Sequence, residues 1–371
     1  MQQDYNSNNY SATVCFFNSN PVWGGGEKWY LETALRLQQK KYNIHLFASK
    51  GGELLLRSKN AGIHSEGIGV RNLSFLNPLK ILWLASRFRK LGVGVIILNL
   101  SSDLKLAGIA ARLAGVKKII YRRGLPIPVA NNLVNRFLYR KVLTSIIANS
   151  QDIKRQILFN NKNLVTPEKI LVIYNSVNES EDRLRAGSSF AFRGNNGVVI
   201  GNAGRLSREK GQTTLIRMAS MLKARNIDFS LIIAGEGNMK KTLTEMVKHA
   251  GIEKHVSFMG FQGDMDNFYS SLDIFVLTSH YEGCSNSLLE AMHFGKPIVA
   301  YNNSSIPEIV ENNVNGLLAE NENLEDLCNK VALLAADREL RIRFGKAGSL
   351  RLKEKFSMQK SLNQLEALFH Q

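Results

Sequence analysis

Short apolar runs alternate with longer amphipathic stretches along most of the chain. In the first half the runs are rich in β-branched residues and have the length of buried strands, and helical periodicity follows most of them. The predicted strands are Ala12–Asn18, Ile44–Ala48, Val93–Asn99, Lys118–Arg122 and Ser145–Asn149. The clearest predicted helices are Glu27–Lys40, which has an apolar stripe, and Gln151–Phe159, with Ser150 as N-cap. The first half is therefore predicted to be a series of βα units.

A second series of the same kind begins at Val198. Its predicted strands are Val198–Ala203, Phe229–Ala234, Val256–Met259, Ile274–Leu277 and Pro297–Ala300. Its predicted helices are Gln212–Lys223, Met239–Ala250, Ser285–His293, Leu324–Lys355 and Met358–Phe369. Between the two series, Asn178–Gly197 mixes charged residues with Ser, Gly and Asn, which is typical of a linker.

The pattern predicts an α/β protein with two doubly wound domains, and a length of 371 residues agrees with that number. We expect a flexible N-terminus over residues 1–10, an N-terminal domain over 11–180, a linker over 181–197 and a C-terminal domain over 198–355. Doubly wound sheets bind ligands at the carboxyl ends of their strands. A cleft between two such edges is the expected site.

Charge distinguishes the two halves. The chain has 48 Lys and Arg and 31 Asp and Glu, a formal net charge of +17. Residues 1–190 hold 27 basic and 11 acidic side chains, whereas residues 191–371 hold 21 and 20. Only the first half is therefore predicted to meet an anionic partner, for which nucleic acid, an anionic membrane surface and a phosphorylated substrate are the candidates. Solvated helix faces are the plainer alternative.

Composition excludes several classes of protein. A hydrophobic content of 44% excludes disorder as the main state. The cysteines Cys15, Cys284 and Cys328 are too few for a disulfide scaffold and lack metal-ligand spacing. The N-terminus is polar without a signal-peptide core, and the apolar run Val93–Leu100 is about half the length of a membrane helix. We expect a cytosolic protein.

The most informative segment runs from Glu282 to Met292 and is followed by Gly295-Lys296-Pro297. Its two glutamates, Glu282 and Glu290, are separated by a polar loop that leads into a helix. A helix N-terminus offers free N–H groups to a phosphate, and a carboxylate within the helix can accept the two hydroxyls of a ribose. The alternative is that both are ordinary acids, favoured near a helix start by the helix dipole.

A second segment, Gly204-Arg205-Leu206-Ser207-Arg208-Glu209-Lys210-Gly211, directly follows a predicted strand. Arg205 and Lys210 are cations at a strand end, where they can clamp a diphosphate and stabilise a departing phosphate without a metal. A solvated basic turn is the commoner meaning of such a stretch. Ala234-Gly235-Glu236-Gly237 ends the next strand at the same edge and by itself indicates only a tight turn.

In this order and spacing, the segments resemble glycosyltransferase family 4, whose members are retaining, nucleotide-sugar-dependent enzymes of the GT-B fold. Further matches are Pro307-Glu308-Ile309-Val310-Glu311, Asn315-Gly316-Leu317-Leu318 and Asn175-Ser176-Val177. The first half matches only in its glycine-rich loop and βα layout. The resemblance implies two Rossmann-like doubly wound domains that face each other across a cleft, with the C-terminal helix (356–371) packed back on the N-terminal domain.

The resemblance also implies roles for single residues. Arg205 and Lys210 would hold the donor diphosphate and stabilise the leaving nucleotide, and Glu282 would contact the transferred sugar, which makes these three the candidate catalytic residues. The other donor-binding residues that it implies are Gly25, Gly26, Gly204, Gly235, Glu236, Gly260, Phe261, Gly283, Cys284, Ser285, Asn286 and Glu290. Among these, Glu290 would bind the ribose hydroxyls.

The first half departs from the family pattern at one place. Many members carry a His-Gly pair after a middle strand of the first domain, and this chain has Tyr121-Arg122-Arg123-Gly124 there. Arg122 and Arg123 are therefore candidate contacts to the acceptor or the transferred sugar, with Arg123 in place of the histidine.

The implied reaction moves a sugar from a UDP- or GDP-sugar to a glycan or lipid-linked acceptor, with retention and without a cofactor. Double displacement needs a carboxylate nucleophile. Apart from Glu27, the acids of the first half do not fall on its glycine-rich or arginine-rich loops. We therefore expect a metal-independent front-face substitution, in bacterial surface polysaccharide or lipopolysaccharide synthesis.

Two basic-aromatic stretches indicate where an anionic membrane surface would bind. One is Leu125–Ile147, whose apolar side is expected to comprise Leu133, Val134, Phe137, Leu138 and Val142. The other comprises Trp83, Arg87, Phe88, Arg89 and Lys90. We expect peripheral binding to the inner face of the cytoplasmic membrane, with a half-buried helix bearing solvated cations as the equal alternative.

Two other functions compete with glycosyl transfer. A GT-B-fold nucleotide-sugar epimerase would need catalytic acids and histidines in the first domain, which the sequence does not offer. A basic nucleic-acid-binding protein would account for the charge of the first half. However, the chain has no helix-turn-helix, zinc or RNA-binding signature.

Overall fold

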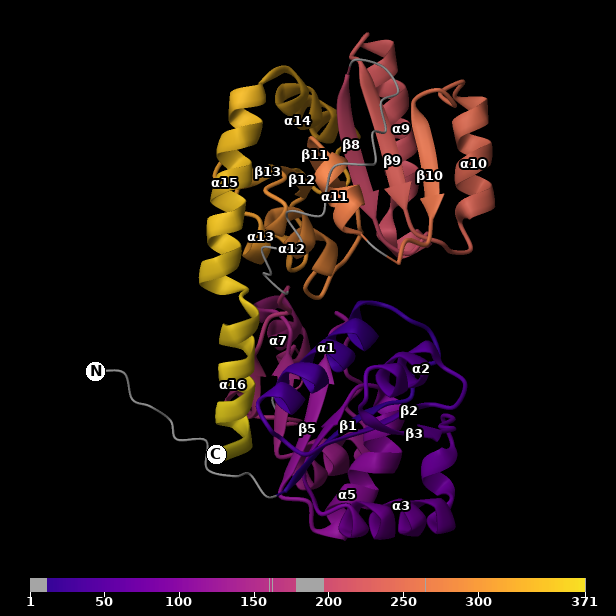
Figure 1. Cartoon of the computed structure of the whole chain (residues 1–371), viewed down its shortest axis with the longest axis vertical. Coiled ribbons are helices and arrows are strands. Elements are labelled where there is room, and N and C mark those ends of the chain that lie inside the picture. Colours follow the sequence, from indigo (N-terminus) through magenta and orange to yellow (C-terminus); the bar gives the residue numbers. More distant parts are fainter. Residues whose placement is uncertain (1–11, 160, 162, 178–196, 264, 371) are drawn as a thin grey trace, which may run out of the picture. The chain divides into compact units, whose positions relative to one another are not determined.

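The computed structural model describes residues 12–159, 161, 163–177, 197–263 and 265–370. These divide into two compact units (Figure 1): unit 1 contains the described residues up to Ile173 together with those from Leu362 on, and unit 2 contains those from Tyr174 to Ser361. The predicted flexible N-terminus (1–10) and nearly all of the predicted linker (181–197) lie outside the described residues.

Unit 1 is built on a seven-stranded sheet in the order β3-β2-β1-β4-β5-β6-β7, with every neighbouring pair parallel. Its strands are β1 (Thr13–Asn18), β2 (Ile44–Ser49), β3 (His64–Ile68), β4 (Val93–Leu98), β5 (Lys118–Arg123), β6 (Ser145–Ala148) and β7 (Ile170–Val172). The central strands β1 and β4 are buried at every residue, as expected for a parallel sheet covered on both faces.

Helices connect the strands of unit 1. The α-helices are α1 (Gly25–Gln39), α2 (Glu53–Asn60), α3 (Pro78–Lys90), α4 (Ser101–Asp103), α5 (Ile109–Ala114), α6 (Leu133–Phe137) and α7 (Gln151–Leu158). The 3₁₀-helical turns are η1 (Ser74–Leu76) and η4 (Pro167–Lys169), and the π-helical turns are η2 (Leu104–Gly108) and η3 (Leu138–Val142). The strand order reverses between β1 and β4, which makes the sheet doubly wound, as predicted.

Unit 2 is built on a six-stranded parallel sheet in the order β10-β9-β8-β11-β12-β13. Its strands are β8 (Val198–Ala203), β9 (Phe229–Ala234), β10 (Val256–Gly260), β11 (Ile274–Leu277), β12 (Ile298–Tyr301) and β13 (Gly316–Ala319). Its helices are η5 (Arg208–Lys210), α9 (Gln212–Ala224), α10 (Lys240–His249), α11 (Asp266–Ser271), α12 (Asn286–His293), α13 (Ile306–Ile309), α14 (Leu324–Ala336) and α15 (Arg338–Lys355). The order reverses between β8 and β11, so the prediction of a second doubly wound sheet is also confirmed.

The prediction of one continuous helix over Leu324–Lys355 was wrong. The chain forms α14 and α15 with Asp337 between them. The Asp337 side chain accepts a hydrogen bond of 2.8 Å from the backbone N–H of Leu340, so it caps a new helix. A final helix, α16 (Met358–His370), follows α15. Within unit 1, its residue Glu366 pairs with Lys40 at 2.5 Å and its Phe369 packs edge-on against Tyr42.

Candidate active site

The loops that follow β8 and β11 meet at the carboxyl edge of the unit 2 sheet, where the strand order reverses. The Thr278 hydroxyl donates to the carbonyl of Gly211 at 2.9 Å, and the His280 N–H donates to the carbonyl of Glu209 at 2.9 Å. In an open α/β sheet this switch point is the place where ligands bind. The two most informative sequence segments therefore lie together in the structure.

Gly211 allows this close approach. Its backbone is left-handed, with φ +65°, and a Cβ atom there would lie 2.1 Å from the carbonyl oxygen of Thr278. No L-residue with a side chain fits against that backbone without displacing it. The glycine therefore lets the loop that carries Lys210 pass directly over the end of β11.

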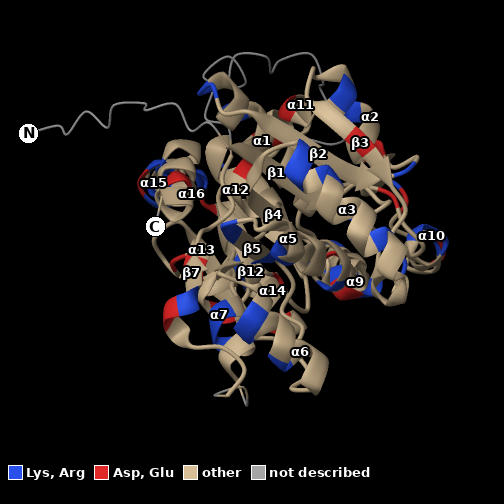
Figure 2. Cartoon of the chain, turned by 90° about the horizontal axis from the view of Figure 1, so that it is seen from below, with Lys and Arg blue, Asp and Glu red and all other residues tan. Residues whose placement is uncertain are grey.

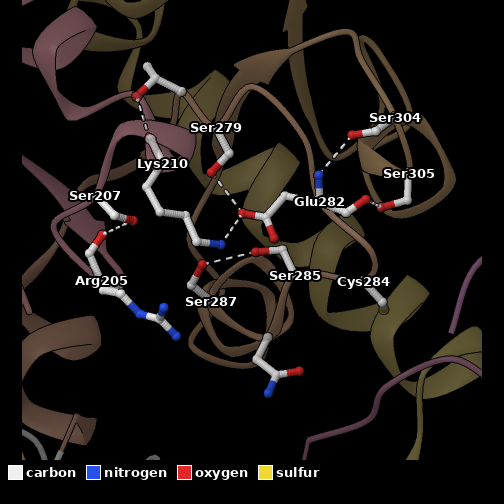
Figure 3. Close-up of polar contacts among 12 residues, drawn as sticks. Arg205, Ser207, Lys210, Ser279, Glu282, Cys284, Ser285, Ser287, Ser304 and Ser305 are labelled. Carbon is white, nitrogen blue, oxygen red and sulfur yellow. Dashed lines mark hydrogen bonds and ion pairs between the residues drawn. The ribbon is translucent and has the colours of Figure 1, made fainter. Parts of the chain in front are cut away.

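An ion pair joins the two loops at the centre of this edge (Figure 3). Lys210 Nζ lies 2.7 Å from Oε1 of Glu282, and the Ser279 hydroxyl donates to the same oxygen at 2.7 Å. The Glu282 side chain is only 8% exposed, whereas that of Lys210 is 28% exposed. Glu282 is thus a buried carboxylate whose cationic partner reaches it from the solvent side.

Two serines of a third loop fix the backbone of Glu282. The Glu282 N–H donates to the hydroxyl of Ser304 at 2.9 Å, and the Ser305 hydroxyl donates to the Glu282 carbonyl at 3.0 Å. These serines and Ser279 were not predicted from the sequence. No motif spacing pointed to Ser304 and Ser305, because a whole strand separates them from Glu282 in the chain.

The loop after Glu282 leads into α12, as the sequence predicted. Glu290 lies within α12 and is buried. Asn175 holds the start of this helix, because its side-chain N–H groups donate to the carbonyl of Cys284 and to Oδ1 of Asn286, both at 2.8 Å. The hydroxyls of Ser285 and Ser287 lie 3.0 Å apart at the same helix start (Figure 3). Asn175 was part of a family match, but that match assigned it no role.

Three strand ends come together beside the ion pair. The Gly204 N–H donates to the carbonyl of Ala234 at 3.0 Å, and the Gly235 N–H donates to that of Gly260 at 2.8 Å, which ties β8 to β9 and β9 to β10. Glu236 forms an exposed ion pair with Lys240 at 2.8 Å. The next residue after Gly260, Phe261, is exposed. These predicted pocket residues therefore share one edge.

Arg205 starts from the same loop as Lys210, but it is not part of the ion pair (Figure 3). Its side chain is exposed, and its guanidinium forms no hydrogen bond or ion pair with any residue that the structure describes. Arg205 is therefore available to an anion in solution, whereas Lys210 already holds Glu282.

In unit 1 the corresponding switch point lies between β1 and β4. The loop after β1 leads to Gly25 and Gly26, the first two residues of α1. Glu27, the next residue, is buried and accepts hydrogen bonds from the side-chain amides of Asn18 at 3.1 Å and Asn20 at 2.8 Å. This carboxylate fixes the loop and does not face solvent.

Unit 1 has a second buried carboxylate, which was not predicted from the sequence. Asp103 follows β4 and is fully buried. It accepts the backbone N–H groups of Leu100 at 2.9 Å and Ser19 at 3.3 Å, and the Ser19 hydroxyl also donates to it. Burial raises the pKa of the Asp103 carboxyl to about 6, because it outweighs these hydrogen bonds.

The two candidate arginines of unit 1 differ in exposure. Arg122 is 2% exposed, and its guanidinium carbon lies 4.2 Å from the ring centre of Trp29. Arg123 is half-buried, and its guanidinium donates to the carbonyl of Ile127 and lies 5.9 Å from the ring centre of Tyr121. Arg123 is therefore the more accessible of the two.

The expectation of metal independence overlooked one feature of the sequence. Asp264-Met265-Asp266 is an Asp-x-Asp pair, the kind that can bridge a diphosphate through a metal. Asp266 begins α11, and Asp264 lies outside the described residues. Within the described ranges no group of three or more His, Cys, Asp or Glu is placed to hold a metal ion.

Both halves of the chain match known families. Residues 190–351 match the family described as Glycosyl transferases group 1, and residues 23–181 match Glycosyltransferase Family 4. An uncharacterized glycosyltransferase of Haemophilus influenzae is 30% identical over 171 residues, which are 46% of this chain and 48% of that protein. The chain thus spans about half the length of this relative.

A longer match and a solved structure extend the comparison. The N-acetylgalactosamine-N,N'-diacetylbacillosaminyl-diphospho-undecaprenol 4-alpha-N-acetylgalactosaminyltransferase of Campylobacter jejuni is 25% identical, over 85% of this chain and 88% of that protein. The crystal structure of Anabaena HepE in complex with UDP has a TM-score of 0.81 at 21% identity, over 96% of this chain and 98% of that chain. This likeness confirms the GT-B fold class. Both matched families are glycosyltransferases, and together they cover the two Rossmann-like halves, so this chain is a glycosyltransferase.

Proposed function

We propose that the chain is a retaining glycosyltransferase that moves a sugar from a nucleotide-diphosphate-sugar to a glycan or lipid-linked acceptor. The observation that carries the proposal is the Lys210–Glu282 ion pair at the switch point of unit 2, beside the start of α12. The UDP bound by HepE supports a nucleotide-sugar donor. The name of the Campylobacter relative supports a lipid-linked acceptor. The names of two other relatives, glycosyltransferases of capsular polysaccharide and lipopolysaccharide core biosynthesis, support a role in surface glycan synthesis.

In this proposal Lys210 and Arg205 bind the donor diphosphate. An ammonium group has three N–H bonds, and the pair with Glu282 uses one, so two remain for phosphate oxygens. Arg205 adds an exposed guanidinium, whose fork geometry suits a phosphate. Together they offset the charge that develops on the leaving diphosphate, the interaction that usually contributes most to such catalysis.

The rest of the donor occupies the edge around the ion pair. Glu290 accepts the ribose hydroxyls, and the exposed Phe261 with Gly235, Glu236 and Gly260 borders the nucleotide. The backbone of 283–286 faces the sugar and phosphates at the start of α12, where N–H groups lack helical partners. Glu282, held by Ser279 and Lys210, contacts the sugar hydroxyls.

The proposed substitution takes place on one face of the sugar. The acceptor oxygen forms a bond to the anomeric carbon, the bond from that carbon to the diphosphate oxygen breaks, and the acceptor proton moves to the diphosphate. Two carboxylates of unit 1 near a switch point, Glu27 and Asp103, are buried and hydrogen-bonded, so neither is presented as a nucleophile. Gly25 and Gly26, at the start of α1, contribute to donor binding, and Arg122 and Arg123 contact the acceptor or the transferred sugar.

We further propose that the domains are 11–180 and 198–355 and that the protein acts at the inner face of the cytoplasmic membrane. No helix in the described part of the chain has the length and apolar composition to cross a bilayer.

We also propose that the donor site uses the cations Arg205 and Lys210 in place of a metal ion that would bridge the diphosphate.

Nucleotide release from a panel of UDP-, GDP- and ADP-sugars tests the function. We expect one donor to be hydrolysed slowly, at the same rate with and without EDTA. Glu290→Ala should lower this rate by about tenfold or more, since a hydrogen bond to a charged group contributes roughly 1.5–3 kcal/mol. The control is Glu339→Ala, which removes an exposed carboxylate from the first turn of α15. Loss of activity in EDTA would disprove metal independence, and equal rates in the two variants would disprove the ribose assignment.

A further inference from the structure

Five large apolar side chains are exposed on and just before α3. We call this set the α3 patch; it comprises Leu73, Leu76, Leu79, Leu82 and Trp83, which are 52–77% exposed. The opposite side of α3 buries Leu84, Ala85 and Phe88 in the core of unit 1. The helix is therefore apolar on two sides, and only one of them is covered by the protein. The expectation that Phe88 belongs to the outer surface was wrong, because Phe88 is fully buried.

A second exposed apolar set lies between β5 and η3. We call it the α6 patch; it comprises Leu125, Ile127, Leu133, Val134 and Phe137, which are 43–80% exposed. Leu138 and Val142 were expected on the same side, but both are buried in the core. A π-helical turn follows α6 at Leu138, and its longer repeat turns these two residues inward. The exposed set is thus shorter than the sequence suggested.

The two patches belong to one helix layer. Helix α3 packs against α5, and α5 packs against η3, which continues α6. Figure 2 shows α3, α5 and α6 from below the view of Figure 1, with Lys and Arg on this layer. Leu113 of α5 is also exposed, between the two patches along the layer.

The charged residues of this layer are almost all basic. Residues 67–151 contain 14 Lys and Arg and a single acid, Asp103. Asp103 is fully buried, so this stretch of 85 residues exposes no carboxylate. Arg87 is neutralised by an ion pair with Glu66 of β3, but Arg89, Lys90, Arg136, Arg140 and Lys141 have no acidic partner among the described residues.

The combination of exposed apolar side chains and cations without an acidic partner indicates which kind of anionic partner fits this layer. Nucleic acid would engage the cations through phosphates, but it offers nothing to cover ten exposed apolar residues that are mostly leucine. An anionic bilayer satisfies both features, since apolar side chains enter the acyl boundary while Lys and Arg contact lipid phosphates. We propose that the α3 and α6 patches form the face by which unit 1 docks on an anionic lipid surface. This inference rests on the proposed function only for its lipid-linked acceptor.

Co-sedimentation with lipid vesicles tests the docking face. The probe is a vesicle of phosphatidylcholine with roughly a quarter phosphatidylglycerol, compared with pure phosphatidylcholine, in about 0.1 M and about 0.5 M salt. The variants are Leu79→Ser with Leu82→Ser for the α3 patch, and Leu133→Ser with Phe137→Ser for the α6 patch. The matched control is Leu333→Ser with Leu350→Ser in unit 2, which removes two leucines that are 50% and 59% exposed.

We expect the full-length wild type to bind the anionic vesicles and to bind less in high salt or without phosphatidylglycerol. Each patch variant should bind at least about tenfold more weakly, and the unit 2 control should bind like the wild type. All four proteins should release nucleotide from the donor at the same rate. The proposal is wrong if the patch variants bind the anionic vesicles as tightly as the wild type does. It is also wrong if the wild type binds vesicles with and without phosphatidylglycerol equally.

A nucleic-acid partner gives a different result in the same series. Equal binding of RNA by the wild type and by both patch variants, with no sedimentation on vesicles, would replace the lipid by nucleic acid and overturn the proposal. Vesicle binding as expected, together with no nucleotide release from any donor, would support the docking face and contradict the proposed function. The two proposals therefore fail separately.

Discussion

Lys210→Ala is expected to lower kcat/KM for the nucleotide-sugar by about 10²–10³-fold, since one lost donor to a developing charge costs roughly 3–4 kcal/mol. The substitution removes the cation proposed to hold the diphosphate. It also leaves the buried Glu282 carboxylate with only the Ser279 hydroxyl on its Oε1. The second effect destabilises the loop, because a buried carboxylate that loses its cation is poorly compensated.

The control separates this role from the general effect of removing a lysine. Lys330→Ala breaks the ion pair with Asp326 on α14, and its side chain is 23% exposed against 28% for Lys210. We expect Lys330→Ala to keep kcat/KM within about twofold of the wild type, because partly exposed pairs within a helix contribute little. Circular dichroism should show both variants folded. A Lys210→Ala enzyme as active as Lys330→Ala would remove Lys210 from the mechanism.

Gly235→Ala is expected to disrupt the proposed donor site by displacing the backbone at the ends of β8 and β9. Gly235 has φ +139°, and a Cβ there would lie 2.0 Å from the carbonyl oxygen of Gly204. Since that oxygen belongs to rigid backbone, the two strand ends must separate and the loop that carries Arg205 must move. We expect donor affinity to fall at least about tenfold and the free energy of unfolding to fall by roughly 2–4 kcal/mol.

Gly251→Ala is the matched control for this experiment. Gly251 also has a positive φ, +61°, but the nearest atom to its Cβ would be the flexible Lys223 Nζ at 4.0 Å. This variant introduces the strain of a side chain in the left-handed region, about 1–2 kcal/mol, without the overlap. Calorimetric titration of the donor nucleotide and denaturant unfolding should separate the two. If Gly235→Ala and Gly251→Ala have the same donor affinity and the same free energy of unfolding, the close approach of the strand ends does not contribute to donor binding.

Much of the fold could be predicted because its central strands are strongly apolar. β1, β4 and β9 are buried at every residue, and their sequences are accordingly mostly apolar. β3 (His64–Ile68) was not predicted, since it lies at a sheet edge and four of its five residues are not fully buried. The break at Asp337 was missed because neither Gly nor Pro marks it and the cap is a single side chain.

The sequence could predict the segments of the candidate site and the sheet edge that they share, but not the contacts between their side chains. Parallel strands place their carboxyl ends at one edge, which brings the loops of Arg205 and Glu282 near each other. The Lys210–Glu282 bond was not predictable, because it spans 72 positions and depends on how Gly211 crosses the end of β11. The sequence also did not show which apolar residues of a helix are buried. Phe88 faces the core, whereas Leu79 and Leu82 on the same helix face solvent.

The most direct test of the account is a calorimetric titration of UDP, GDP and ADP into the full-length protein, without any acceptor. We predict that one of these nucleotides binds to a single site. Glu290→Ala should weaken that binding by about tenfold or more through the lost ribose contacts, while Glu339→Ala should leave it unchanged. If none of the three nucleotides binds the wild type, the edge around Lys210 and Glu282 is not a donor site.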